Sequence, residues 1–355
     1  MKFLIISYAG IGDTFFATPL IHELRANFPD STIDVFVRWK GSKDLLEGNP
    51  HVNSVYQKDL VKTGQTGSLK LLGQLRGNRY DVSINTHPQS RVAYRAVARM
   101  INAGLRLSHS YENSTWFDQL LVNRSIPQDY ELHAIENNLR FLELLKAKTK
   151  LPKHEYEIYL SPSELAWAEE WITNQKLTGR KLLGIHVGSG GTKNLALRRW
   201  PLTAYGELIK RLNRALPDLA ILLFGGPEEE KDHARLLAES KSGQVFHPQT
   251  KSLRQAAALV KKCDAFLSVD TALMHAAAAM KVPRQVVIET PTWNKPIQPY
   301  NNPFLLVKNP AVAGRNLEYY RYDGKGIKGM DAELIKCMES VSVEAVFDVL
   351  QEALR

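Results

Sequence analysis

The stretch SYAGIGDTFFATP at residues 7–19 places an acid inside a glycine-rich turn. Gly10 and Gly12 allow a tight connection between a strand and a helix, and Asp13 follows them directly. A dinucleotide-binding loop would need a third glycine where this chain has Phe15, and an acid at the end of the next strand, which is missing. Two interpretations of Asp13 stay open: a first-turn acid that stabilises the helix, or a carboxylate that acts as a base.

A second stretch, SVDTALMHAAAAM at residues 268–280, joins an apolar strand to an alanine-rich helix. The free N–H groups of a first helical turn, together with the Thr271 hydroxyl, suit an anion such as a diphosphate. His275 comes four residues after Thr271, on a similar helix face, and could reach the same phosphate. Alone, Asp270 or Thr271 could simply cap the helix, but the set favours an anion site.

Two further stretches follow predicted strands. HVGSGGTKNLALRRWP at residues 186–201 offers backbone donors, and Lys193, Arg198 and Arg199 add charge that can bind phosphate, although no Walker loop is present. FGGPEEE at residues 224–230 puts acids just beyond a strand end, where a carboxylate can accept hydrogen bonds from ribose hydroxyls. The alternative for these acids is an exposed helix N-terminus.

Strands and helices must alternate to position these stretches. Such alternation predicts parallel sheets covered by helices on both faces. Pro19 falls inside the first predicted helix and should kink or loosen it, and residues 291–329 read as irregular. The predicted strands are Phe3–Ser7, Ile33–Val37, Val52–Tyr56, Val82–Asn85, Leu182–Val187, Leu219–Phe224, Ala265–Val269 and Val286–Ile288, and the predicted helices include Phe15–Phe28, Leu69–Leu75, Tyr205–Leu216, Leu253–Val260 and Ser342–Leu354.

The alternation lapses near residues 151–159, and a helix then begins with Ser161 as a cap and Glu164 as its capping-box partner. We therefore predict two doubly wound α/β domains, residues 1–160 and 161–335, followed by a C-terminal segment, 336–355. Ligands of such sheets bind beyond the carboxyl ends of the strands.

Composition narrows the class of protein. The net charge of +9 favours anionic partners. No nucleic-acid-binding motif is present, so we expect no nucleic-acid partner. Cys263 and Cys337 lack metal-ligand spacing and predict no disulfide. Short apolar runs and the lack of a signal-peptide pattern predict a cytoplasmic protein. Arg91, Arg95 and Arg99, spaced by four, should share one helix face.

In their order and spacing, GIGDTFFATP, GSGGTKNLALRRWP, LLFGGPEEE and SVDTALMHAAAAMKVP resemble the motifs of glycosyltransferase family 9, the ADP-heptose:lipopolysaccharide heptosyltransferases. The resemblance covers nearly the whole chain. It implies a GT-B fold, in which two Rossmann-like domains face each other across a cleft and the last helix returns to the first domain. It also implies an inverting transfer of heptose from ADP-heptose to the lipopolysaccharide inner core, without metal or cofactor, at the cytoplasmic face of the inner membrane.

Site residues follow from the resemblance. It implies that Asp13 is the catalytic base. It implies a donor site in the second domain built from Ser189, Thr192, Arg198, Glu228 or Glu229, Asp270, Thr271, Ala272 and His275, where Ala272 replaces the family's usual glycine. The acceptor-binding candidates lie in the first domain: Gly12, Arg38, His87, Arg91 and Arg95. The basic members of this set would bind acidic sugars or phosphates and contact an anionic membrane.

Other functions remain as alternatives. A family member with another nucleotide sugar or acceptor is one, because residues 290–303 and 319–329 lie where sugar choice could be set. A nucleotide-sugar-binding protein without catalysis is another, although an acid in a glycine turn argues against it. A nicotinamide oxidoreductase is disfavoured by Phe15 at the third glycine position.

Overall fold

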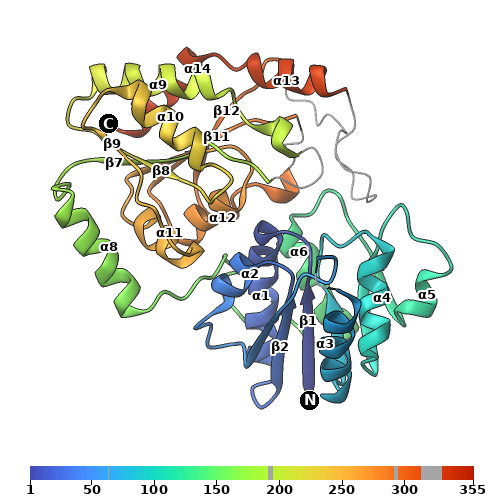
Figure 1. Ribbon diagram of the computed structural model, residues 1–355. Coiled ribbons are helices and arrows are strands. Elements are labelled where there is room, and N and C mark those ends of the chain that lie inside the picture. The colour runs from blue at the N-terminus through green and yellow to red at the C-terminus, as the bar shows by residue number, and fades with distance from the viewer. Residues whose placement is uncertain (63, 191–194, 292–294, 313–329) are drawn as a thin grey trace. The chain divides into compact units, whose positions relative to one another are not determined.

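The computed structural model divides into two units, which are described separately (Figure 1). The first holds residues 1–159 and the second holds the described residues from 160 onwards, so the division lies beside the boundary expected from the sequence. Helix α8 (Pro162–Asn174) opens the second unit as predicted, since Ser161 Oγ accepts a hydrogen bond from Glu164 N at 3.3 Å. The residues that the structure describes are 1–62, 64–190, 195–291, 295–312 and 330–355.

The first unit is a parallel six-stranded sheet in the order β3-β2-β1-β4-β5-β6. Helices α3 and α4 pack on the face of the sheet to which Leu4 and Ile6 of β1 point, and Figure 1 shows α1 on the other side of β1. The strands are β1 (Lys2–Ser7), β2 (Thr32–Val37), β3 (Ser54–Gln57), β4 (Val82–Asn85), β5 (Leu105–Ser110) and β6 (Arg124–Pro127), and the helices are α1 (Ile11–Asn27), α2 (Lys40–Leu46), α3 (Gln65–Gly77), α4 (Val92–Ile101), α5 (Asp118–Leu121), α6 (Ala134–Leu139) and α7 (Phe141–Leu144).

The second unit repeats this topology, with a parallel sheet in the order β12-β11-β10-β7-β8-β9. Counted from β7, this is again the doubly wound order 3-2-1-4-5-6 read from the other edge. The strands are β7 (Leu182–His186), β8 (Ala220–Phe224), β9 (Val245–Phe246), β10 (Ala265–Ser268), β11 (Arg284–Ile288) and β12 (Phe304–Val307); besides α8, the helices are α9 (Leu202–Ala215), α10 (Glu230–Ser240), α11 (Leu253–Val260), α12 (Ala272–Ala279), α13 (Asp331–Glu339) and α14 (Val343–Ala353), with 3₁₀ turns η1 (Leu195–Arg198) and η2 (Lys295–Ile297).

Helix α1 runs through Pro19, which was expected from the sequence to kink or loosen it. Proline cannot donate the hydrogen bond that the carbonyl of Phe15 would receive in a regular helix. The Thr18 hydroxyl donates to that carbonyl instead, at 2.8 Å. A neighbouring side chain thus satisfies the group that Pro19 leaves without its usual donor.

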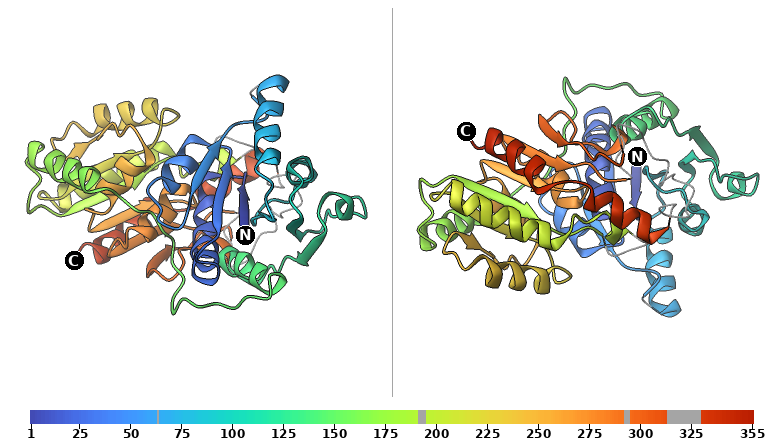
Figure 2. Two further views of the ribbon diagram at one scale, coloured as in Figure 1. Left: turned by 90° about the horizontal axis from the view of Figure 1, so that it is seen from below. Right: turned by 90° about the horizontal axis from the view of Figure 1, so that it is seen from above.

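Helices α13 and α14 belong to the second unit, and the expected return of the last helix to the first domain stays a prediction. Figure 2 shows both helices, in red, beside α9 (yellow-green) in the right-hand view. Val346 and Leu350 of α14 are fully buried in the core of the second sheet. Trp200 Nε1 also donates to the carbonyl of Val341 at 2.9 Å, which fixes the turn between the two helices.

Some elements were not expected. Strand β12 lies inside the span that the sequence marked as irregular, and β5, β6, β9 and α13 were not predicted. The motif at 319–329 lies outside the described residues, as does part of 290–303. Among the described residues, no helix has both the length and the apolar character needed to cross a membrane.

Candidate functional site

Both sheets have a switch point where the strand order reverses, between β1 and β4 in the first unit and between β7 and β10 in the second. Loops diverge from the carboxyl ends of the strands at such a point, and ligands of doubly wound sheets bind there. Asp13 follows β1 and His87 follows β4, while Ser189 follows β7 and Asp270 follows β10. The predicted residues therefore gather at one switch point in each unit.

Asp13 is the third residue of α1, and its carboxylate caps the helix. Gly10 N donates to Asp13 Oδ2 at 2.6 Å, which confirms the first-turn interpretation. A Cβ at Gly10 would lie 2.9 Å from the same oxygen, so the glycine permits this close approach. Trp39 Nε1 donates to Ala9 O at 2.7 Å and anchors the turn. The capping bond holds the partly exposed carboxylate in place, which a general base also requires.

Tyrosines lie within the electrostatic reach of Asp13. Burial is the main cause that raises the pKa of Tyr94 and Tyr111, and the negative charge of Asp13 raises both further. The Tyr111 hydroxyl accepts a hydrogen bond from Gln89 N at 2.8 Å and lies 3.2 Å from His87 Nδ1. These phenols therefore stay protonated at neutral pH and can donate hydrogen bonds.

His87 is fully buried, which corrects its expected place on an accessible acceptor-binding surface. Its backbone N–H donates to Asn138 Oδ1 at 2.7 Å, and the ring stacks on Tyr111. Burial holds the pKa of His87 well below its usual value, so the ring is neutral. A neutral, enclosed imidazole supports the loop after β4 and cannot bind an anionic sugar from solvent.

Arg95 is also buried, with 1% of its surface exposed, so it does not share a solvated basic face with Arg91 and Arg99. Its guanidinium forms an ion pair with Asp118 and donates to the carbonyls of Gln89 and Ser90 at 3.3 and 3.2 Å. Spacing by four places residues on one side of a helix, but that side of α4 meets α5. Arg95 is therefore a structural residue.

The other acceptor candidates remain accessible to different extents. Gly12 lies in the first turn of α1 and is partly exposed. Arg38 is half-buried, donates to Asp59 at 3.1 Å and stacks over Trp39 at 4.4 Å. Arg91 caps α4 and is exposed.

In the second unit, the donor candidates surround the N-terminus of α12. Thr271 is the N-cap, and its hydroxyl accepts a hydrogen bond from Met274 N at 3.3 Å. His186 Nδ1 lies 3.0 Å from the same hydroxyl. Arg198 forms an ion pair with Asp270. The structure thus places a guanidinium at the positive end of a helix, which is an anion-binding arrangement.

The rest of the predicted donor set is distributed around this point. Ala272 is the first residue of α12, and His275 is buried one turn further on. Ser189 is buried, and its hydroxyl has no hydrogen-bond partner among the described residues. Thr192 lies outside the described residues.

The structure separates Glu228 from Glu229. Glu228 is exposed, whereas Glu229 is buried, accepts from Gly226 N at 2.9 Å and pairs with Arg199 at 2.9 Å. Burial is the main cause that raises the pKa of Glu229. A Cβ at Gly188 would overlap the Glu229 carboxylate, so a glycine is needed there.

Sequence reasoning missed His186, and it assigned Arg199 only as charge that can bind phosphate. His186 ends β7 and contacts the Thr271 hydroxyl, and Arg199 links Glu229 to the carbonyl of Ser189 at 3.0 Å. A signal for His186 was present, since it is a polar residue at the carboxyl end of a central strand. Arg199 stands next to Arg198 in the sequence, and only the fold shows that their side chains bind different acids.

Comparisons with known proteins agree with this geometry. The family model of glycosyltransferase family 9 (heptosyltransferase) matches residues 68–319. Lipopolysaccharide heptosyltransferase 3 of Escherichia coli is 25% identical over 287 residues, which cover 77% of this chain and 78% of the relative.

Solved structures show the same fold. A glycosyltransferase family 9 protein from Veillonella parvula aligns with a TM-score of 0.76 at 19% identity, covering 99% of this chain and 97% of that one. The E. coli heptosyltransferase WaaC with ADP-2-deoxy-2-fluoro heptose aligns with a TM-score of 0.70 at 20% identity, covering 99% of both chains. The fold is therefore GT-B, with two Rossmann-like units. The chain belongs to glycosyltransferase family 9, the heptosyltransferase family.

Proposed function

We propose that this glycosyltransferase transfers a heptose from ADP-heptose to the inner core of lipopolysaccharide, with inversion and without a metal ion. The observation that carries the proposal is the Arg198–Asp270 ion pair beside Thr271 at the N-terminus of α12. The relative from E. coli is named for lipopolysaccharide, and WaaC was solved with an ADP-heptose analogue. The first name supports a lipopolysaccharide acceptor, and the second supports an ADP-heptose donor.

The donor diphosphate would bind at the first turn of α12. Backbone N–H groups there lack partners within the helix, and the helix dipole favours negative charge. In this structure, Asp270 accepts a hydrogen bond from Arg198. When the nucleotide sugar binds, its phosphate can accept that hydrogen bond instead. The ribose hydroxyls would bind Glu228 or Glu229, and a glutamine variant of each distinguishes the two.

The transfer is a single displacement at the anomeric carbon. The acceptor hydroxyl oxygen attacks this carbon, Asp13 takes the hydroxyl proton, and the bond to the diphosphate oxygen breaks with its electrons on that oxygen. The first turn of α12, Arg198 and His275 would stabilise the departing charge. One displacement inverts the anomeric configuration, and these groups supply the stabilisation that a metal would otherwise give.

The acceptor and the membrane would contact the first unit. Arg38 and Arg91 are the basic candidates that the structure leaves accessible. Trp116 is 74% exposed and Leu120 is 56% exposed, and Arg124, the first residue of β6, is exposed as well. Exposed aromatic, aliphatic and basic side chains together suit an anionic membrane surface.

Membrane contact can be tested by sedimentation with anionic vesicles. We expect that Trp116→Ser and Leu120→Ser together abolish vesicle binding, while Val61→Ser, which changes a valine that is 76% exposed elsewhere, leaves it intact. Equal vesicle binding by all variants would show that Trp116 and Leu120 do not make the membrane contact.

The decisive test of the function is a donor screen with mass detection of the product. Purified protein is incubated with truncated lipopolysaccharide cores and ADP-heptose, ADP-glucose or UDP sugars. Mass gain of one heptose from ADP-heptose alone supports the proposal. Transfer from another nucleotide sugar supports a different family 9 specificity, and donor binding with no product from any donor would indicate a non-catalytic binding protein.

A further inference from the structure

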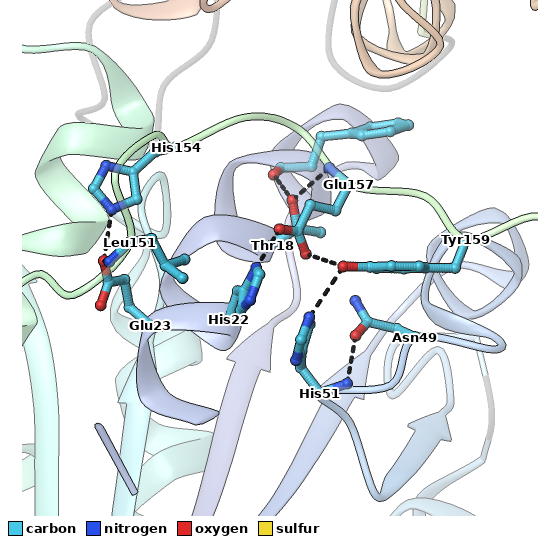
Figure 3. Close-up of polar contacts among 10 residues, drawn as sticks. Thr18, His22, Glu23, Asn49, His51, Leu151, His154, Glu157 and Tyr159 are labelled. Atoms are coloured by element: carbon cyan, nitrogen blue, oxygen red, sulfur yellow. Dashed lines mark hydrogen bonds and ion pairs between the residues drawn. The ribbon is translucent and has the colours of Figure 1, made fainter. Parts of the chain in front are cut away.

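Away from the candidate site, two histidines and a glutamate from three different elements of the first unit meet at one place (Figure 3). His22 lies in the second half of α1, His51 lies in the loop before β3, and Glu157 lies in the segment that ends the unit. One possible ligand atom of each lies within 4.8 Å of those of the other two. All three residues are partly exposed, so an ion can enter from solvent.

Hydrogen bonds already draw this cluster together. His22 Nδ1 lies 2.6 Å from Glu157 Oε1, and the Tyr159 hydroxyl donates to Glu157 Oε2 at 3.0 Å. His51 Nε2 lies 3.0 Å from the same hydroxyl, and the rings of His22 and His51 stack with centroids 3.7 Å apart. Glu157 thus contacts His22 directly and is linked to His51 through the Tyr159 hydroxyl.

The chain around the cluster is held independently of it. The buried Glu23 carboxylate accepts from Leu151 N at 2.9 Å and lies 2.8 Å from His154 Nε2 (Figure 3). Thr18 Oγ1 accepts from Glu157 N at 3.1 Å. These bonds fix the backbone of the segment against α1, so Glu157 is positioned before any ion arrives.

We propose that His22, His51 and Glu157 bind one Zn²⁺, each through a single atom, with water as the fourth ligand. Two imidazoles and a carboxylate are a donor set that zinc accepts, whereas Ca²⁺ and Mg²⁺ prefer oxygen ligands alone. A tetrahedral zinc site places its ligand atoms about 3.3 Å apart. The possible ligand atoms already lie within 4.8 Å of one another, and binding would require the two stacked imidazoles to turn toward the ion.

Tyr159 would then be an outer partner of the site. Its hydroxyl keeps the hydrogen bond to Glu157 Oε2 and orients the carboxylate while Oε1 binds the ion. The ion would replace the contact between His22 and Glu157 and join α1, the His51 loop and the end of the first unit.

The proposed zinc site lies away from the proposed catalytic base on α1. His22 comes nine residues after Asp13, which is about 13 Å along a helix axis. Zinc there cross-links segments that are far apart in the sequence and stabilises the folded state. The proposed sugar transfer does not require it.

The test is calorimetric titration of chelator-treated protein with Zn²⁺ at neutral pH. We expect one zinc per chain, and at least about 100-fold weaker binding in His51→Ala and in Glu157→Gln, more than outer-partner changes usually cost. Glu155→Gln is the matched control, since Glu155 lies two residues from Glu157 in the same segment but pairs with the exposed Lys153. It should bind zinc like the wild type.

A second measurement covers the case in which a variant fails to fold. Cobalt added to wild-type protein should give the visible spectrum of a tetrahedral site with nitrogen and oxygen ligands, and zinc should displace it. The proposal is overturned if the wild type binds no zinc, if folded His51→Ala and Glu157→Gln bind it unchanged, or if cobalt gives an octahedral spectrum. All of these readouts are independent of sugar transfer.

Discussion

Asp13 caps a helix, and in the proposed function it is also the catalytic base. Its carboxylate accepts the Gly10 N–H and so completes the first turn of α1. The same bond keeps the side chain at the carboxyl end of β1, where an acceptor hydroxyl would have to come. A capping residue becomes a good base when its position is fixed and its surface stays partly open.

We predict that Asp13→Asn keeps ADP affinity and stability but loses transfer by at least about 100-fold, because the amide still caps the helix and cannot take a proton. Single-turnover transfer, calorimetry with ADP and urea denaturation measure the three quantities. Asp30→Asn, at an exposed turn of the same unit, should behave like the wild type. Near-normal transfer by Asp13→Asn would leave Asp13 with capping alone.

Arg198 is the second residue with a sharp expectation. We predict that Arg198→Ala weakens ADP binding by about 10- to 100-fold, since a charged hydrogen bond is lost and Asp270 is left to repel the phosphates. Arg198→Lys should recover part of the loss by restoring the charge. Arg235→Ala, on the exposed side of α10, is the control. Unchanged ADP affinity in the alanine variant would refute the phosphate contact.

At the scale of the elements, the loop after β7 packs closely against the segment that follows β8. Gly188 leaves room for the buried Glu229 carboxylate, which in turn holds Gly226 and Arg199. Gly188 therefore serves packing as well as any contact with a ligand.

We predict that Gly188→Ala lowers stability by about 1–3 kcal/mol, because the new methyl group overlaps the Glu229 carboxylate. ADP affinity should fall with it, since the displaced loop carries Ser189. At Gly190, two residues further on, a Cβ would meet only Leu195 Cδ1, at 3.6 Å, so Gly190→Ala is the matched control. Urea midpoints that are equal for the two variants would contradict this explanation.

For the whole molecule, buried histidines predict sensitivity to acid. Burial lowers the pKa of His109 and His186 to about 3 and that of His233 to about 4, and it lowers the pKa of His87 and His247 as well. Below pH 6.5, the ordinary value, the unfolded chain binds protons that the folded chain does not. Stability is therefore complete above that pH and falls as the pH approaches 4.

Urea denaturation between pH 7 and pH 5 measures this loss before most carboxylates titrate. The midpoint should fall steadily over that range, and His233→Gln should flatten the slope because one of the buried sites is removed. A midpoint that stays constant from pH 7 to pH 5 would show that these histidines do not control the acid response.

Much of the architecture was predictable because its signals are local. Strand Val82–Asn85 and helix Leu253–Val260 have the predicted bounds, since apolar runs and periodicity depend on adjacent residues. Ser161 and Glu164 form the predicted capping box for the same reason. Edge strands such as β9, with only two residues, gave no such signal.

The residues of the candidate site differ in the same way, because some have a local sequence signal and others do not. Asp13, Asp270 and Thr271 could be recognised because each sits at a strand end inside a motif of a few residues. The burial of His87 and Arg95 could not, because it depends on partners such as Asn138 and Asp118 that strand order brings alongside.

The sequence by itself therefore determined the local features, namely the glycine turns, the helix caps and the strand ends, and it indicated the family to which they belong. Contacts between distant segments were not, because they follow from the order of strands in each sheet and from the space that remains between packed helices. The pairing of Arg198 with Asp270 spans 72 residues, and that of His22 with Glu157 spans 135. Sequence periodicity carries no information about contacts between such distant residues. For the same reason, only the folded structure shows that Glu229 is buried while Glu228 is exposed.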